Sequence, residues 1–415
     1  LCTVLSTVLA MSSTAALNTS AYADSANTQQ VSYNYWYNSS TGYTDENVHT
    51  RQMEKLDRGL IAIKTDGGVY LSWRLFDSED NIFGSADKNV SFNVYRDGKK
   101  ISEVATKTNY VDSTVGTNYS VAPVINGVEG EKCDAVTVYN NSYFDIPLSK
   151  PDDETIYDPS GNELATYSFF PADCSTGDVD GDGEYEIIVK WTSSEHDVGS
   201  PGDPAYSGTI HLAAYKLDGT KLWKNDIALG KNVYSSAHTL QFLVYDFDGD
   251  GKSEVMCQTS LGSKDGQGEY VSNAAQTDEE IKAITDEENS TADYRGYGRI
   301  TEGKEFLTVF NGETGVAMDT INLPTTRGSE NGVDYGDDFG NRSNRFVSDI
   351  AYLDGEKPYA IYLRGYYFGR NGKQRTSIAG ISWDGTALSP TYRFDTQKGQ
   401  EGYYDGAYQY VGNGN

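Results

Sequence analysis

Carboxylates repeat at alternate positions in two short stretches of this 415-residue chain. Residues 177–191 read GDVDGDGEYEIIVKW, and residues 246–256 read DFDGDGKSEVM. Both stretches follow the pattern D-x-D-G-D-G-x-x-E and then enter an apolar run. Calcium takes roughly six to eight oxygen ligands from carboxylates and backbone carbonyls, with a glycine for the tight turn. The pattern therefore predicts two calcium-binding loops.

These loops differ from an EF-hand, in which helices flank the loop and the last glutamate comes three places later. The β-type runs that follow place the loops between strands. An acidic, solvated turn is the alternative, and the repetition of the spacing argues against it. The residues expected to hold Ca²⁺ are Asp178, Asp180, Asp182, Glu184, Glu186, Asp246, Asp248, Asp250, Lys252 and Glu254.

The charge balance narrows the choice of partner. The chain has 61 acidic and 33 basic residues and a net charge of −28. Proteins that bind nucleic acid carry basic stripes, so we expect no nucleic-acid partner. The abundance of glycine and tyrosine, with short apolar runs, predicts an all-β chain with many turns.

The first 23 residues are small or apolar, contain no acid and end in Ala21-Tyr22-Ala23. This ending is typical of a signal peptide, here clipped at its start, and predicts a secreted, extracellular protein. The apolar stretch is too short and polar to span a membrane, so no membrane partner is expected. The three remaining cysteines, Cys133, Cys174 and Cys257, are widely spaced and odd in number, which favours buried free thiols.

Turn signals and apolar runs divide the rest of the chain. Residues 24–48 are polar and are interpreted as a linker. Residues 49–142 carry strand-like runs with hairpin turns at Asp97-Gly98 and Asn126-Gly127, which predict a small fibronectin-like β-sandwich. Residues 143–415 are interpreted as a partial β-propeller domain.

Repeated strands carry the propeller prediction. Three units have an inner strand, a turn, a second strand and a later hairpin at Asp218-Gly219, Asn311-Gly312 or Asp384-Gly385. Four short strands per unit are typical of propeller blades. In the third unit, Asp354 lies where the acidic loop stood, so metal binding is expected to be lost there. The second unit holds an insertion at 262–304, with a short helix expected from Thr277 to about Glu287.

Several side chains are candidates for substrate binding. His238 precedes an inner strand and could line a central cavity, or it could be a hydrogen-bonded core histidine. Guanidinium groups suit carboxylates, although structural salt bridges are the alternative, and tyrosines could stack on sugars or pack in the core. The substrate-binding candidates are Thr192, His238, Arg342, Arg345, Arg364, Tyr366 and Tyr367.

The ordered set of motifs resembles a known family, the bacterial rhamnogalacturonan lyases of polysaccharide lyase family 11. The resemblance runs in order from about His49 to the last residue and includes both acidic loops. The other matching stretches are RQMEKLDRG at 51–59, SFNVYRDG at 91–98, DIPLSKP at 145–151, EFLTVFNG at 305–312, FGNR at 339–342 and RGYY at 364–367.

The resemblance implies an eight-bladed, calcium-rich propeller, incomplete in this chain, that follows a small β-domain and is monomeric when complete. It implies cleavage of the rhamnose–galacturonate backbone of pectin, rhamnogalacturonan I, by calcium-assisted β-elimination. The residues that take the proton are expected beyond Asn415, so no catalytic residue is assigned here.

Two positions depart from the family pattern, which has an Asn-Asp pair before the first acidic loop and a Trp-Asp pair after its strand. This chain has Ala172-Asp173 and Trp191-Thr192. Both altered positions are associated with substrate binding in the family. A non-catalytic, calcium-stabilised carbohydrate-binding propeller therefore stays open as an alternative, while an integrin-like adhesion propeller is disfavoured by the matches outside the loops.

Overall fold

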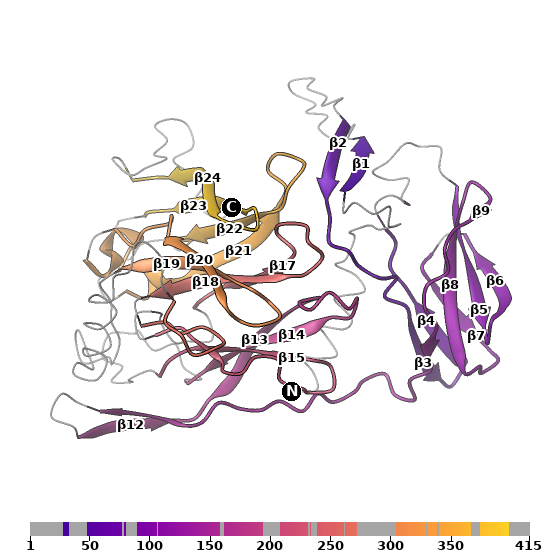
Figure 1. Cartoon of the computed structure of the whole chain (residues 1–415), viewed down its shortest axis with the longest axis horizontal. Coiled ribbons are helices and arrows are strands. Elements are labelled where there is room, and N and C mark those ends of the chain that lie inside the picture. The colour runs from indigo at the N-terminus through magenta and orange to yellow at the C-terminus, as the bar shows by residue number, and fades with distance from the viewer. Residues whose placement is uncertain are drawn as a thin grey trace. The chain divides into compact units, whose positions relative to one another are not determined.

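The structure is a computed structural model in which nearly every element is a strand (Figure 1). The all-β prediction is therefore confirmed. No helix in the described part of the chain is long and apolar enough to cross a membrane. The chain forms two compact units, whose main boundary lies between Ile146 and Pro147. The described residues are 28–32, 48–76, 79, 89–105, 107–157, 162–193, 208–230, 233, 239–260, 262–271, 304–328, 330–337, 340–366 and 374–397.

The first unit contains two antiparallel sheets that enclose one hydrophobic core. The core draws on both sheets, with Ala62 and Leu71 from one and Val94 and Val121 from the other fully buried. The three-stranded sheet has the order β3 (Ile61–Thr65), β4 (Gly68–Ser72) and β7 (Asn109–Asp112). The larger sheet has the order β10 (Val136–Thr137), β8 (Asn118–Ile125), β5 (Val90–Arg96) and β6 (Lys99–Val104), with β9 (Val128–Glu129) paired to β8.

Both hairpin turns predicted in this unit are present. Asp97 and Gly98 have φ angles of 48° and 78°, and Asn126 and Gly127 have φ angles of 52° and 80°. Two consecutive left-handed residues make the type I′ turn, whose twist matches that of the flanking strands. Aspartate, asparagine and glycine tolerate this conformation best, which explains why the sequence signal was reliable here.

Residues 24–48 were interpreted as a linker or N-terminal arm, and the described part of this range contains one strand. Strand β1 (Thr28–Ser32) pairs antiparallel with β2 (Val48–Gln52). The sequence of β1 is TQQVS, which has one apolar residue and therefore lacks the alternation that signals a half-buried strand. Strands β1 and β2 are recognised by their backbone pairing, which the pattern of apolar residues does not reveal.

The second unit is built from three successive four-stranded antiparallel sheets (Figure 1). The first contains β13 (Phe170–Gly177), β14 (Glu186–Thr192), β15 (His211–Tyr215) and β16 (Ile227–Ala228). The second contains β17 (Phe242–Tyr245), β18 (Glu254–Ser260), β19 (Glu305–Phe310) and β20 (Ala317–Asn322). The third contains β21 (Phe346–Ala351), β22 (Tyr359–Arg364), β23 (Ser377–Trp383) and β24 (Leu388–Asp395).

Two strands of the second unit precede these three sheets, and two short 3₁₀ helices lie between the second sheet and the third. Before the first sheet, β11 (Glu154–Tyr157) pairs antiparallel with β12 (Glu163–Tyr167). Two short 3₁₀ helices, η2 (Glu330–Tyr335) and η3 (Arg342–Asn344), precede the third sheet. The helix expected between Thr277 and Glu287 lies outside the described residues.

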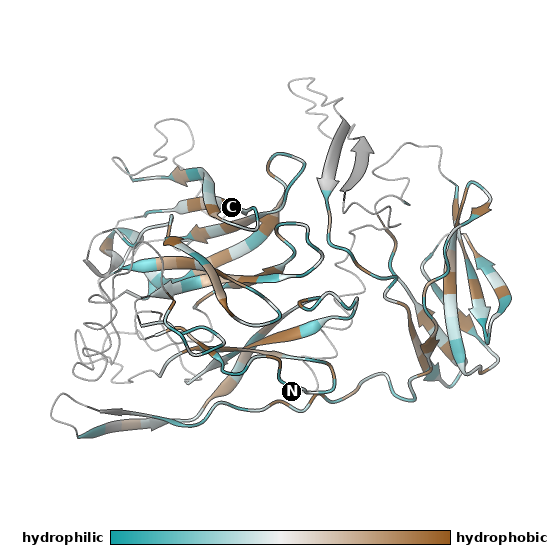
Figure 2. Ribbon diagram, viewed as in Figure 1, coloured by the Kyte–Doolittle hydropathy of each residue, from teal (hydrophilic) through white to brown (hydrophobic). Residues whose placement is uncertain are grey.

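Apolar side chains join the sheets in pairs. One buried cluster contains Ile188 and Leu212 of the first sheet with Val255 of the second, and another joins the second sheet to the third. Figure 2 shows the corresponding brown strand interiors and teal turns. The hydroxyl of Tyr362 in β22 also donates a buried hydrogen bond to the carbonyl of Met256 in β18, at 2.8 Å.

Hydrogen bonds join the turn ends of the first and second sheets. The amide of Ser253 donates to the carbonyl of Asp178 at 2.7 Å. The indole N–H of Trp223 donates to the carbonyl of Gly312 at 2.8 Å. A Cβ at Gly312 would lie 2.0 Å from the carbonyl oxygen of Ser253, so this approach requires glycine.

Candidate metal loops and a buried charge network

The two acidic loops occupy equivalent places in consecutive sheets. The first joins β13 to β14, and the second joins β17 to β18. Each loop has two glycines in the left-handed region, with φ angles of 80° and 91° at Gly181 and Gly183, and 82° and 94° at Gly249 and Gly251. Such angles are easily reached only by glycine. The repeated glycines therefore give both loops the same backbone course.

The first loop folds around the carboxylate of Asp178. Its two oxygens accept hydrogen bonds from the amides of Gly181 at 2.7 Å and Gly183 at 2.9 Å. Carboxylate oxygens of Asp178, Asp180 and Glu186 all lie within 4.8 Å of one another. This grouping of acidic oxygens matches the donor chemistry of a calcium ion.

The second loop brings together Asp246, Asp248 and Asp250, whose ligand oxygens also lie within 4.8 Å of one another. The glutamates that end the two patterns have the same contact. Glu186 accepts from the amide of Val179 at 3.0 Å, and Glu254 accepts from the amide of Phe247 at 2.9 Å. Each glutamate therefore closes its loop from the first residue of the following strand.

Burial makes negative charge unfavourable in the first loop. Burial raises the pKa of Asp178, and the neighbouring aspartates add to this effect. The pKa of Glu186 is raised to about 7, again first by burial and then by Asp180 and Asp182. Buried, clustered carboxylates are stabilised when a dication neutralises them. The donor set and its electrostatics thus fit Ca²⁺.

The other predicted ligands lie differently. Asp182 accepts from the amide of Glu184 at 2.9 Å, and the side chain of Glu184 is exposed. The ammonium group of Lys252 pairs with Glu313 at 2.6 Å, so only its carbonyl could serve a metal ion. These three residues are not part of the oxygen groups described above.

The candidate substrate-binding residues are dispersed. Thr192 is 1 % exposed at the end of β14, and Arg345 is 8 % exposed, with its Nε donating to Asn341 at 3.3 Å. Arg342 is partly exposed, and its Nε lies 3.8 Å from a carboxylate oxygen of Asp337. Tyr366 is 38 % exposed. His238 and Tyr367 lie outside the described residues.

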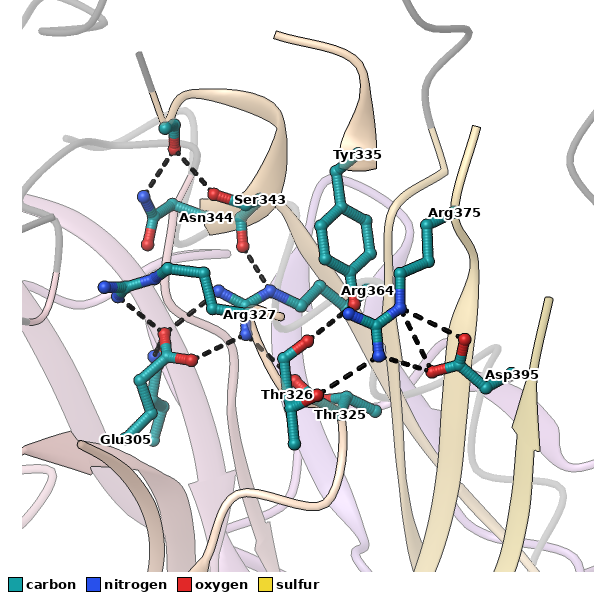
Figure 3. Close-up of polar contacts among 12 residues, drawn as sticks. Glu305, Thr325, Thr326, Arg327, Tyr335, Ser343, Asn344, Arg364, Arg375 and Asp395 are labelled. Atoms are coloured by element: carbon teal, nitrogen blue, oxygen red, sulfur yellow. Dashed lines mark hydrogen bonds and ion pairs between the residues drawn. The ribbon is translucent and has the colours of Figure 1, made fainter. Parts of the chain in front are cut away.

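Arg364 was predicted to bind substrate, but the structure contradicts this role because its side chain is fully buried. Figure 3 shows its guanidinium group against Glu305, to which it donates at 2.8 and 2.9 Å. It also donates to the carbonyls of Thr325, at 2.9 Å, and Ser343. The alternative of a structural salt bridge therefore applies to Arg364.

Glu305 is the centre of this network. Arg327 donates to it at 2.7 Å and the amide group of Gln258 at 3.0 Å. Burial opposes ionisation of Glu305, but Arg327 and Arg364 outweigh it and lower the pKa to about 2. One carboxylate thus holds two guanidinium groups and links β18, β19 and β22.

A second buried pair lies beside the first (Figure 3). Arg375 donates to both oxygens of Asp395, with the shortest contact at 2.7 Å. The guanidinium groups of Arg375 and Arg364 lie 5.1 and 5.4 Å from the centre of the Tyr335 ring. Both are within cation–π distance, so η2 is held against β22 and the residues just before β23.

Sequence reasoning missed Glu305, Arg327 and Lys216. Arg364 lies 59 positions from Glu305, a separation at which no local pattern reports contact. Lys216 follows the third strand of its sheet, and its ammonium group lies 2.6 Å from Asp180 and 3.2 Å from Asp182. Its position after a strand was the only available signal.

Comparison with known proteins follows the two-unit architecture. The family description "Rhamnogalacturonan lyase family 11, C-terminal domain" matches residues 143–415. "Rhamnogalacturonan I lyases beta-sheet domain" matches residues 51–139. The chain belongs to rhamnogalacturonan lyase family 11.

Two characterised relatives come from Bacillus subtilis. The chain is 42% identical to the rhamnogalacturonan endolyase YesW over 352 residues, covering 84% of this chain and 50% of that protein. It is 40% identical to the rhamnogalacturonan exolyase YesX over 360 residues, covering 85% and 52%. The chain therefore spans about half the length of these relatives.

Solved structures of rhamnogalacturonan lyases also match this chain, again over about half of their length. The crystal structure of the exotype lyase YesX matches with a TM-score of 0.67 and 38% identity, over 85% of this chain and 53% of that one. The rhamnogalacturonan lyase of Bacillus licheniformis matches with a TM-score of 0.65 and 43% identity, over 85% and 54%.

Proposed function

We propose that this chain belongs to a secreted, calcium-dependent lyase that cleaves the backbone of rhamnogalacturonan I by β-elimination. The observation that carries the proposal is the match of residues 143–415, which include both acidic loops, to the lyase family. The endolyase and exolyase relatives act on rhamnogalacturonan by name. The signal-like residues 1–23 support secretion, because pectin is an extracellular polymer.

The three four-stranded sheets are proposed to be consecutive propeller blades. Each has the same antiparallel order, and buried clusters join each sheet to the next. Repeated sheets of this kind are the unit of a propeller. The two acidic loops would then lie at the same end of adjacent blades.

Elimination needs removal of the proton at C5 of galacturonate. The electron pair then forms the C4–C5 double bond as the bond from C4 to the leaving oxygen breaks, and that oxygen takes up a proton. Positive charge beside the galacturonate carboxylate stabilises the developing enediolate. No described residue is assigned as the proton acceptor.

Asp178, Asp180 and Glu186 would hold one calcium ion, and Asp246, Asp248 and Asp250 another. A bound calcium ion supplies fixed positive charge that offsets the repulsion among these carboxylates. The loop amides of Gly181 and Gly183 already fix the Asp178 carboxylate, so this residue is positioned before an ion arrives. We propose that these two sites support the fold rather than the reaction.

A carbohydrate-binding propeller without lyase activity is the second candidate. Ala172 and Thr192 favour it, because they replace polar residues of the family pattern and Thr192 is buried. An alanine there cannot form the hydrogen bond that an asparagine would make, which is worth about 0.5–1.5 kcal/mol net.

The test uses the longer protein to which this chain is proposed to belong, because the residues that take the proton are expected beyond Asn415. It is incubated with rhamnogalacturonan I and calcium, and unsaturated uronate ends are detected by their ultraviolet absorbance. We expect product from rhamnogalacturonan and none from homogalacturonan, the matched polymer that lacks rhamnose. Polymer retardation in a native gel without unsaturated ends, before and after the double substitution Ala172→Asn and Thr192→Asp, would instead support the binding module.

A further inference from the structure

Lys216 occupies a position that recurs in all three sheets, namely the first residue after the third strand. The corresponding residues are Asn311 after β19 and Asp384 after β23. Both of these fold back onto their own turns. Asn311 accepts from the amide of Thr314 at 2.9 Å, and Asp384 accepts from the amide of Thr386 at 2.9 Å.

In the first sheet the turn is held by another residue. The carboxylate of Asp218 accepts from the amide of Thr220 at 2.8 Å. The side chain of Lys216 is therefore not needed to close its own turn. It extends to the acidic loop, where its ammonium group lies 2.6 Å from Asp180 and 3.2 Å from Asp182.

This contact coincides with a difference between the loops. In the second loop all three aspartates, Asp246, Asp248 and Asp250, contribute to the oxygen group. In the first loop the group contains Asp178, Asp180 and Glu186, without the third aspartate. One oxygen of that third aspartate, Asp182, is instead the partner of the lysine.

An ammonium group at this place has two opposite effects. Without a metal ion, it offsets the mutual repulsion of the two aspartates it contacts. When a dication approaches the same oxygens, the ammonium repels it and must withdraw from Asp180. The lysine therefore stabilises the metal-free loop and competes with the metal ion.

We propose that Lys216 is a tethered counter-cation that lowers the calcium affinity of the first loop and reduces its dependence on calcium. This inference rests on the proposed calcium binding by that loop. With Lys216 in place, the first loop should keep its shape at calcium concentrations that are too low to occupy its binding site. A divalent cation is the ligand, and Lys216 sets the concentration at which it binds.

The test uses the whole chain with Asp248→Ala, which disables the second loop. Calcium is titrated calorimetrically, and melting temperatures are measured in chelator and in saturating calcium. Lys216→Asn should tighten calcium binding about fivefold, the size expected when an exposed ion pair is removed. It should lower the melting temperature in chelator and leave it unchanged or higher in calcium.

Two matched variants distinguish an effect of the Lys216 charge on calcium affinity from a general effect of replacing a lysine. Lys216→Arg keeps the charge and should keep the parent affinity. Lys221→Asn removes a lysine whose ion-pair partner is Asp226, at 2.6 Å, and not a loop carboxylate, and it should leave calcium binding unchanged. If Asp248→Ala does not fold, the same variants are compared in the parent chain by a two-site fit.

The outcomes are distinct. An unchanged calcium affinity in Lys216→Asn, or an equal loss of melting temperature with and without calcium, overturns the role of Lys216 while the calcium site stands. If neither loop takes up calcium in the parent chain, the calcium assignment itself fails, and this inference fails with it.

Discussion

At the scale of single residues, the buried ion pairs of the second unit should contribute more to folding stability than the exposed ion pairs. Arg364 is completely buried, and Glu305 is its principal anionic partner. Removing one member of a buried ion pair leaves the other charge without compensation. Exposed pairs such as Lys150 with Asp153 lie mostly in water and are screened by it.

Arg364→Ala should therefore destabilise the protein by about 3–5 kcal/mol. The variant leaves Glu305 with Arg327 and Gln258 and leaves the carbonyl of Thr325 without its buried donor. Urea unfolding followed by circular dichroism measures the change. The matched control is Lys150→Ala, which removes a solvent-exposed pair and should change stability little; equal losses in the two variants would refute the argument.

Glu305 should also make stability depend on acid. Its pKa of about 2 in the folded chain lies below the ordinary value of 4.5, so the contribution is complete above pH 4.5. It is lost as pH falls from about 4.5 to about 2, by roughly 1.4 kcal/mol for each unit of pKa difference. The stability advantage of the parent over Glu305→Gln should shrink across this range. An advantage that stays constant down to pH 2 would contradict the assignment.

At the scale of elements, the contact between the second and third sheets combines apolar packing with a buried hydrogen bond from Tyr362. Tyr362 is 1 % exposed and donates to the carbonyl of Met256. Burial raises the pKa of Tyr362 well above its usual value, so the hydroxyl stays neutral and remains a donor.

Tyr362→Phe should cost about 0.5–1.5 kcal/mol, because it removes this bond while keeping the ring. Tyr392→Phe is the matched control, since Tyr392 is 42 % exposed and contacts Tyr359 through its ring. Thermal unfolding of both variants gives the comparison. A control that loses as much stability as Tyr362→Phe would show that the buried bond is unimportant.

Inner strands and turns were predictable because their signals are local. The apolar runs at 187–189 and 360–363 mark buried strands, and the paired Asp-Gly and Asn-Gly residues mark turns. The range of β24, the strand after the predicted hairpin at Asp384-Gly385, was not given from the sequence, because its burial is mixed along its length. The acidic loops were predictable for the same local reason as the turns, whereas the reach of Lys216 and the pairing of Glu305 with Arg364 join residues far apart in sequence.

At the scale of the whole molecule, the net charge of −28 opposes the approach of a polyanion. Galacturonate in the proposed substrate is also negative, so the two repel at long range. Salt shortens that range, from about 30 Å at 0.01 M to about 8 Å at 0.15 M ionic strength.

Binding to rhamnogalacturonan should therefore tighten by a few fold when sodium chloride is raised over this range at constant calcium. Calorimetry or gel retardation can follow it. The control ligand is rhamnogalacturonan with its carboxyl groups reduced to alcohols, which should show no salt dependence. Weaker binding at higher salt would mean that local cationic groups outweigh the net charge.

The hydrogen bond from the Ser253 amide to the carbonyl of Asp178 has a consequence for solvent exchange. The residue lies in a loop, yet it is 2 % exposed and its amide is held by the neighbouring sheet at 2.7 Å. Its proton can reach water only when the two sheets part at this seam. In deuterium oxide, the Ser253 amide should exchange at the rate of a strand interior and so report the opening of one sheet from the next.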